Sequence, residues 1–566
     1  MLLHFIGADH EVTGSCHIIE TNNHWIMIDR GMEQGKDIYE NADLPCKPSD
    51  IDAILLTHAH IDHSGLLPLM HAEGFQGKIY ATKATCDLCD VMLRDSAHIQ
   101  EFEAEWRNRK GKRLGQAPYE PVYTMQDAMA VIEQFVPKDY GTVYEILDGV
   151  KVRYTDVGHL LGSACIEVWV TEGDKEVKLV FSGDLGNTDQ PILRDPQTVD
   201  SADYLIIEST YGDRLHDRRV DYVDELTPII QKTLDRGGNV VIPSFAVGRT
   251  QEMLYFIRQI KAENRITGHD DFTVIVDSPL ANEATTIFTK HSMDCYDDKA
   301  KALIEQGINP IGFRGLKLSI TSDDSKAINA DPEPKVILSA SGMCDAGRIK
   351  HHLKHNLWRP ESTVLFVGYQ AEGTLGRALI DGAHEVKLFG ESVTAAAEIC
   401  ELPGISGHAD QNGLLAWAGA LKEKPRKTFV VHGEDSVCDI FADLLHEKLG
   451  YDAEAPYSGA VFDLIAGEFT EKPAGIPIVK EKEEEPAAAG EKRKTAEPQT
   501  AAAAAGGIEA PNPAMIRNPV SVYARLVDAA RKLWTLVNSM KGRSKKEVGN
   551  MLDELNDLIT KYEDND

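Results

Sequence analysis

The 566 residues of this chain allow two to four domains, and a hydrophobic content of 42% suffices for sizeable cores. A membrane or secreted protein is not expected, because no run approaches the roughly 18 apolar residues of a membrane helix, the N-terminus lacks a signal-peptide pattern, and nine scattered cysteines favour free thiols in the cytoplasm. The net charge of −31 opposes long-range attraction of nucleic acid, so a site that binds it needs a local positive potential.

Residues 1–212 are predicted to form short strands with few helices, including a hairpin turn at 21–24. One segment of this region, directly after an apolar run, is rich in metal-ligand side chains: Thr57-His58-Ala59-His60-Ile61-Asp62-His63. His58 and His60 are two residues apart, so an extended backbone points both rings to one side. Imidazole nitrogen and carboxylate oxygen suit zinc. Four candidate ligands within one short segment are rarely ordinary core or surface residues.

Three further candidate ligands stand alone, each after an apolar, β-prone run: His159, Asp184 and His432. Taken singly, such a histidine is more often a satisfied core or surface residue. Strand ends that converge on one edge of a fold would instead bring all three to the first segment. These side chains are too many for one metal ion and match two ions that share one carboxylate. Two ions about 3.5–4 Å apart form a clamp for phosphoryl displacement.

Three more motifs complete the pattern: Leu205–Gly212 (LIIESTYG), Ser406–Asp410 (SGHAD) and Val431–Gly433 (VHG). Together with His-x-His-x-Asp-His at 58–63, they resemble the motifs of the β-CASP nucleases of the metallo-β-lactamase superfamily, the group of the cleavage and polyadenylation endonuclease, its prokaryotic relatives and RNase J. The resemblance runs from Phe5 to about residue 470. It implies an α/β fold, a metallo-β-lactamase αββα sandwich with an inserted parallel-sheet α/β β-CASP domain.

The resemblance also implies a role for each site residue. One zinc ion is held by His58, His60 and His159, the other by Asp62, His63 and His432, and Asp184 bridges them. In the implied reaction a hydroxide activated by both ions attacks an RNA phosphodiester, and the catalytic residues beside the ions are Asp62, Glu208 and His408. Glu208 orients a ligand or His408, and His408 is the general acid for the departing ribose oxygen. Glu208 also fits an ordinary strand-end carboxylate in an ion pair.

From 213 to 390 the pattern changes to alternating strands and helices, which predicts a parallel, helix-covered sheet. Apolar runs predict strands at 239–243, 273–276, 335–338 and 363–367, and helices are expected at 250–262 and 348–357. This region matches the inserted domain. Residues 391–474 then return to the first domain and bring His408 and His432 to the site.

Two turns of the insert are candidate phosphate contacts, one with Arg249 and one with Ser341 and Arg348. Each follows a predicted strand and opens a helix, where free backbone N–H groups attract anions. Ordinary strand-to-helix turn chemistry, with glycine needed for backbone shape, explains the same pattern, so both interpretations stay open. The basic cluster at 107–113 is equally open, as a solvated helix face or an RNA contact.

The last part of the chain lies beyond the resemblance. A low-complexity, disordered linker is expected at 475–514, and two apolar stripes of helical period predict a helical hairpin at 515–566. Such a hairpin can dock on the enzyme, pair two subunits in a homo-oligomer or bind a partner.

The sequence therefore predicts a cytoplasmic ribonuclease with two zinc ions per chain. His432 favours RNA as the substrate, because DNA-directed β-CASP nucleases of the interstrand-crosslink repair type usually carry Val at this motif. A thioester or lactone hydrolase of the superfamily lacks the insert and the Ser-Gly-His-Ala-Asp motif, and a catalytically inactive paralogue loses metal ligands. Cleavage within the RNA and stepwise 5′-to-3′ cleavage both stay open.

Overall fold

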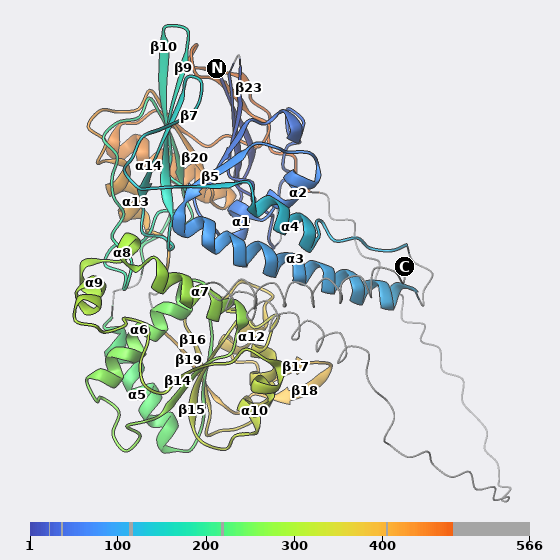
Figure 1. Cartoon of the computed structure of the whole chain (residues 1–566), viewed down its shortest axis with the longest axis vertical. Coiled ribbons are helices and arrows are strands. Elements are labelled where there is room, and N and C mark those ends of the chain that lie inside the picture. Colours follow the sequence, from blue (N-terminus) through green and yellow to red (C-terminus); the bar gives the residue numbers. More distant parts are fainter. Residues whose placement is uncertain (22, 36–37, 113–116, 217–219, 403–405, 479–566) are drawn as a thin grey trace, which may run out of the picture. The chain divides into compact units, whose positions relative to one another are not determined.

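A computed structural model describes residues 1–478 of the chain apart from 22, 36–37, 113–116, 217–219 and 403–405. The expected linker lies outside the described residues from 479 on, and the expected hairpin at 515–566 lies outside them entirely. Figure 1 shows the described residues as two lobes, with α3 (Lys83–Gly111) of the first lobe beside α7 (Pro279–Lys290) of the second. No helix among the described residues is long and apolar enough to span a membrane.

The first lobe is built on two mixed sheets. The eight-stranded sheet has the order β23 (Glu468–Glu471), β22 (Val461–Asp463), β1 (Leu2–Gly7), β2 (Cys16–Glu20), β3 (Trp25–Ile28), β4 (Ala53–Leu55), β5 (Lys78–Thr82) and β6 (Phe135–Lys138). The seven-stranded sheet has the order β21 (Ala453–Glu454), β20 (Lys427–Val431), β11 (Tyr204–Glu208), β10 (Lys175–Phe181), β9 (Ala164–Glu172), β8 (Val150–Asp156) and β7 (Tyr144–Leu147). The expected hairpin turn joins β2 to β3.

The two sheets face each other across a shared apolar core. Alternate residues of each strand point to opposite faces, so Phe5 of β1 and Ile166 and Val168 of β9 lie in that core. Their neighbours Ile6 and Cys165 pack instead beneath the helices on the outer faces.

Helices cover both outer faces of the sheet pair. On the eight-stranded side these are α1 (Ile61–Ser64), α2 (Leu67–Ala72), α3 and α4 (Met125–Ile132), and on the seven-stranded side α13 (Gln411–Ala418) and α14 (Asp435–Leu449). The lobe is therefore the expected αββα sandwich. The described part of residues 1–212 has eleven strands and four α-helices, which confirms the expectation of short strands with few helices, but the 29-residue α3 was not predicted.

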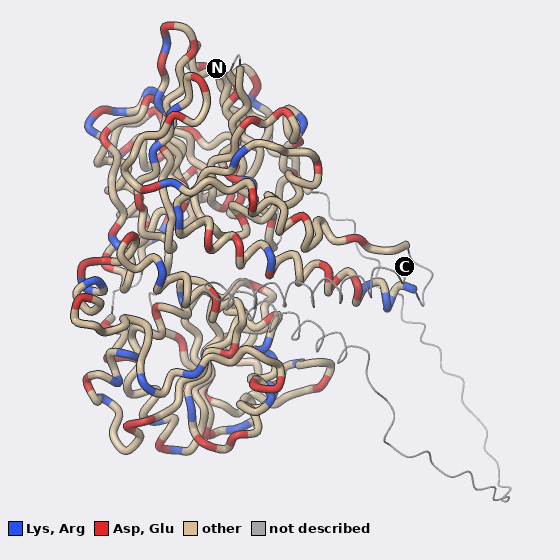
Figure 2. The backbone as a smooth tube through the Cα atoms, viewed as in Figure 1, with Lys and Arg blue, Asp and Glu red and all other residues tan. Residues whose placement is uncertain are grey.

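The C-terminal half of α3 is rich in charged residues (Figure 2), and three of its apolar side chains, Ile99, Phe102 and Trp106, are exposed. Glu103 pairs with Arg107 and Glu105 with Arg109, each one helical turn apart. These acidic partners offset part of the basic cluster, as expected for a solvated helix face.

The insert forms the second lobe on a six-stranded, wholly parallel sheet. Its order is β14 (Leu316–Leu318), β13 (Thr273–Val276), β15 (Lys335–Ser339), β12 (Val240–Pro243), β16 (Thr363–Phe366) and β19 (Glu398–Glu401). Strands β12, β13, β15 and β16 confirm the predicted runs. Both faces of the sheet are buried, since Val240 and Ile242 lie in one core and Val241 in another.

Helices cover both faces of this sheet as well. One core contains residues of α5 (Tyr222–Asp235), α6 (Arg249–Ala262) and α7, and the other contains residues of α11 (Ile349–Asn356) and α12 (Leu375–Ile380). The predicted helices correspond to α6 and α11. The lobe is completed by α8 (Ser292–Cys295), α9 (Asp298–Glu305), α10 (Ser322–Ala330) and the hairpin of β17 (Glu385–Leu388) with β18 (Glu391–Thr394).

The insert ends later than its expected boundary at residue 390. Strand β19 pairs with β16 and completes the insert's sheet, so the polypeptide leaves the insert only after Glu401. It then supplies α13, β20 and α14 to the sandwich. The sandwich is therefore discontinuous in sequence, and residues before and after the insert can meet at one site.

Candidate metal centre

Candidate ligands come from strand ends at one edge of the sandwich. His58 and His60 follow β4, Asp184 follows β10 and His432 follows β20 directly. Asp184 comes close to the first segment because residue 183 is glycine. Gly183 has a φ of 55°, and a Cβ atom there would lie 2.8 Å from the Cβ of Thr57.

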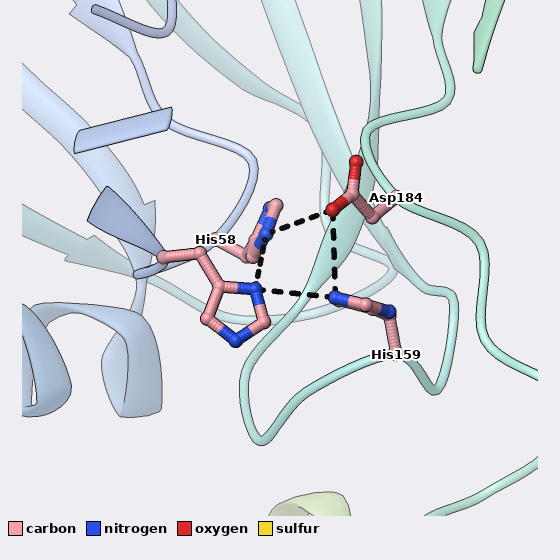
Figure 3. A group of neighbouring side chains, drawn as sticks. His58, His159 and Asp184 are labelled. Atoms are coloured by element: carbon pink, nitrogen blue, oxygen red, sulfur yellow. Dashed lines mark hydrogen bonds and ion pairs between the residues drawn. The ribbon is translucent and has the colours of Figure 1, made fainter. Parts of the chain in front are cut away.

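One set of ligand atoms surrounds a single point (Figure 3). It consists of His58 Nε2, His60 Nδ1, His159 Nε2 and Asp184 Oδ2. The Nδ1 of His60 lies 3.0 Å from His58 Nε2 and 3.2 Å from His159 Nε2. Asp184 Oδ2 lies 3.3 Å from the His58 nitrogen and 3.4 Å from the His159 nitrogen. Tetrahedral zinc with bonds of about 2.0–2.1 Å separates its ligand atoms by about 3.3–3.4 Å, so the set fits this ion.

The second set uses the other oxygen of the same carboxylate. Asp184 Oδ1 lies 3.2 Å from His63 Nε2 and 3.6 Å from His432 Nε2. The two imidazole nitrogens are 3.1 Å apart, and Asp62 Oδ2 lies 3.7 Å from His432 Nε2. One oxygen of Asp184 thus faces each set, which is the arrangement of a carboxylate that bridges two ions.

The burial of these groups also suits a cation. Asp184 is only 2% exposed, and its Oδ1 accepts no hydrogen bond from any described residue. Burial lowers the pKa of His60 to about 3 and that of His159 well below its ordinary value, so both rings are neutral and keep a lone pair for a metal. A buried carboxylate with an oxygen that accepts no hydrogen bond is costly unless a positive charge offsets it.

Comparisons with known proteins place this chain in a family. The metallo-beta-lactamase superfamily model matches residues 11–244, the Beta-Casp domain model matches 250–379, and the model of the Zn-dependent metallo-hydrolase RNA specificity domain matches 392–456. Ribonuclease TTHA0252 of Thermus thermophilus is 37% identical over 432 residues, which cover 76% of this chain and 92% of that protein. The chain belongs to the β-CASP family of the metallo-β-lactamase superfamily. It is a metal-dependent hydrolase.

Two further relatives are transcription termination factors. FttA of Methanocaldococcus jannaschii is 32% identical over 452 residues, which cover 78% of this chain and 68% of that protein. FttA of Methanosarcina mazei is 30% identical over 465 residues, which cover 80% of this chain and 69% of that protein. The three family models together span both lobes, and the third contains His408 and His432.

Neighbouring groups fix the orientation of the candidate ligands in this β-CASP protein. Asp29 accepts a hydrogen bond from His63 Nδ1 at 2.7 Å, and Thr57 Oγ1 donates to the same carboxylate at 2.8 Å. His432 Nδ1 lies 3.1 Å from Thr210 Oγ1. Such outer partners hold the ring so that the opposite nitrogen faces the metal. No role was predicted for Asp29 from the sequence, and its position directly after β3 was the available signal.

His408 is held beside the ligand sets by Glu208. The two carboxylate oxygens of Glu208 both lie 3.3 Å from His408 Nδ1, and its Oε1 also accepts from the backbone N–H of Leu185 at 2.6 Å. His408 Nε2 faces Asp184 at 4.0 Å. Burial lowers the pKa of His408, but the charge of Glu208 outweighs this effect and raises the pKa to about 9. Without a metal ion the ring is therefore protonated at neutral pH, the form that a general acid requires.

The candidate phosphate contacts of the β-CASP insert have partners within the insert. Arg249 is largely buried and donates to Glu252 at 2.5 Å. Arg348 donates to Asp277 at 2.7 Å and to the carbonyl of Ile320 at 2.8 Å. Both guanidinium groups thus bind carboxylates of their own lobe, and a role in phosphate binding stays a prediction. Ser341 is half-buried in the turn after β15, and its role stays a prediction as well.

Proposed function

We propose that this chain is a zinc-dependent ribonuclease that hydrolyses phosphodiester bonds of RNA with two zinc ions per chain. His58, His60 and His159 would hold one ion, and Asp62, His63 and His432 the other. Asp184 would hold both. The observation that carries the proposal is the division of the Asp184 oxygens between two ligand sets, 3.3 Å from His58 on one side and 3.2 Å from His63 on the other.

The side chains beside the ions have separate roles in the proposed reaction. Bound zinc supplies a nucleophile at neutral pH and neutralises charge that develops on the phosphate. His408 provides the proton for the leaving ribose oxygen. Its Nδ1–H donates to Glu208, so the proton on Nε2 points toward the ligand sets and is the one transferred. Glu208 thus keeps His408 oriented and charged, and Thr210 and Asp29 keep the ligand rings in place.

RNA is the substrate that the comparisons favour. The RNA specificity domain model covers the segment with His408 and His432, and the ribonuclease matches over 92% of its length. The termination factors match over only 68–69% of theirs, so RNA cleavage is proposed and termination is not. A DNA-directed relative is disfavoured by His432, and a small-molecule hydrolase by the insert.

The cytoplasm is the proposed location. All nine cysteines are free thiols, and unpaired thiols persist in a reducing compartment.

A single cleavage assay tests the proposal. RNA and DNA of one sequence are labelled at either end, and the RNA carries a monophosphate or a hydroxyl at its 5′ terminus. We expect RNA to be cut faster than DNA, with metal analysis near two zinc ions per chain. Product ladders from the two labels distinguish internal from stepwise cleavage. Faster cleavage of DNA, or an active preparation without metal, contradicts the proposal.

A further inference from the structure

Two large aromatic side chains are exposed at the carboxyl edge of the β-CASP sheet. Phe245 follows β12 by two residues and is 49% exposed, and Tyr369 follows β16 by three residues and is 61% exposed. These strands are neighbours and run parallel, so both rings emerge at the same edge. Single exposed aromatic side chains are common on protein surfaces. Here, however, two exposed aromatic side chains lie together at the carboxyl ends of parallel strands. Open α/β sheets bind their ligands at this edge, so a binding role is the better explanation.

Both side chains stand on a fixed backbone. The ring of Phe245 packs on a residue without a side chain, since a Cβ atom on Gly342 would lie 3.5 Å from two of its carbons. The Phe245 carbonyl accepts from Thr250 Oγ1 at 2.7 Å. The buried amide of Gln370 lies 3.1 Å from the carbonyls of Gly342 and Tyr369 and so joins the two turns. A fixed aromatic surface binds a flat partner without a large entropy cost for its own ordering.

This edge of the insert adjoins the proposed catalytic residues. Strand β19 is parallel to β16, and the chain beyond β19 leads to His408. Burial raises the pKa of Tyr211, and the charge of the Tyr369 phenol raises it further. The rings of Tyr211 and His408 lie 6.1 Å apart between centroids. On the other side, a Cβ atom on Gly248 would lie 3.4 Å from Leu160, the residue after His159.

We propose that Phe245 and Tyr369 stack on bases of single-stranded RNA that flank the phosphodiester bound at the metal centre. This inference rests on the proposed ribonuclease function. Every base has a π-face, so such stacking selects an unpaired strand without reading its sequence. In a duplex the same faces are covered by neighbouring base pairs. The enzyme is therefore expected to cut unpaired RNA of many sequences and to cut the same RNA poorly within a duplex.

Side-chain removal gives the first test. Phe245→Ala and Tyr369→Ala should each raise KM for single-stranded RNA roughly tenfold or more, from the loss of one stacked base. Phe245→Trp and Tyr369→Phe should restore it. The kcat on an activated aryl phosphodiester, which has no flanking base, should not change, and zinc content should stay at the wild-type level. The matched control is Trp358→Ala, because Trp358 is 56% exposed but precedes β16, at the opposite edge of the sheet.

Substrates that lack single bases give the second test. Removing the base next to the cut should weaken wild-type cleavage as much as the alanine substitution does, and combining the two changes should add little further loss. If the wild type cuts RNA but neither the variants nor the abasic substrates differ from their controls, the stacking inference is wrong and the ribonuclease proposal stands. If the wild type cuts no RNA, both fail.

Discussion

Asp184 in the sandwich and Asp277 in the β-CASP insert are both buried carboxylates that follow a strand and face histidine side chains. In the insert, side chains of the insert itself compensate the buried charge of Asp277. Asp277 Oδ2 accepts from His352 Nε2 and from Ser325 Oγ, each at 2.6 Å, and its Oδ1 accepts from Arg348 at 2.7 Å. Side chains of the insert thus meet both oxygens, with the permanent donor Arg348 on Oδ1, and the cluster is complete without a ligand.

The sandwich leaves its carboxylate without such donors. The nearest neighbours of Asp184 are imidazole nitrogens of other candidate ligands, and Oδ1 accepts no hydrogen bond from the described residues. The comparison teaches that a buried Asp–His cluster is by itself ambiguous. What distinguishes a metal centre from a structural network is whether the protein supplies enough donors to satisfy the carboxylate.

The largest expected effect comes from removing the bridging carboxylate. Asp184→Ala should lower RNA cleavage by more than about 10³-fold, because several kcal/mol of metal-derived stabilisation are lost together. Metal analysis should show loss of zinc, while circular dichroism should show the wild-type fold. If the variant keeps its zinc and its activity, Asp184 is not a metal ligand and, like Asp277, belongs to a structural network.

His408 is expected to give the next largest effect. His408→Ala should slow RNA cleavage roughly 10²–10⁴-fold, the usual contribution of a positioned general acid. Both zinc ions should remain, since His408 belongs to neither proposed ligand set and forms a separate group with Asp184 and Glu208, with its Nε2 4.0 Å from Asp184. An aryl phosphodiester with a leaving group that needs no proton should be affected much less. Equal losses on both substrates with zinc retained would make His408 a phosphate-positioning residue, and loss of one zinc would make it a ligand.

Asp29→Asn should have a smaller effect, by weakening the hold on one ligand ring. The carboxylate accepts from His63 Nδ1 and from Thr57, and outer partners of this kind contribute about 10- to 100-fold to metal affinity or activity. Competition with a chelator measures the zinc affinity directly. The control is Asp50→Asn, a change at an exposed carboxylate of the same lobe. Unchanged zinc affinity would show that Thr57 and the backbone suffice to orient His63.

The sequence predicted the parts of this structure that depend on local patterns. Buried parallel strands such as β12 and β16 are continuous apolar runs, and the His58–His63 segment has a ligand spacing that few structural roles produce. Parallel and neighbouring strands end at common edges, so the convergence of His159, Asp184 and His432 followed from their positions after such runs.

Features that depend on distant partners were not predictable in this way. Asp29 and His63 are 34 residues apart, and no local pattern connects them. Strand β19 is short and begins and ends with glutamate, so only its pairing with β16 identifies it as part of the insert. Arg348 has the sequence context of a phosphate contact, but Asp277, 71 residues away, is its partner in the fold.

Substitution of Asp277 should lower the stability of the insert and leave the rate of RNA cleavage unchanged. Asp277→Asn leaves His352 and Arg348 without their buried charge partner, so the insert should lose roughly 3–5 kcal/mol of unfolding free energy. Hydrogen exchange of the β13 and α11 amides measures this loss. Zinc content and RNA cleavage per folded molecule should stay at the wild-type level. As a control, Asp271→Asn removes an exposed partner of Arg314 and should cost less than about 1 kcal/mol.

The pH dependence of the stability difference between the wild type and Asp277→Asn tests whether the charge of Asp277 causes that difference. Burial raises the pKa of Asp277, but hydrogen bonds from His352, Ser325 and Arg348 outweigh burial and hold the pKa well below its ordinary value. The folded state therefore binds this proton more weakly than the unfolded chain does, so the carboxylate stabilises the insert at any pH above its unfolded pKa of about 4. The stability gap between the wild type and Asp277→Asn should be constant near neutral pH and narrow as the pH falls below about 4. A gap that does not change on acidification would mean that the shape of the side chain, and not its charge, holds the network together.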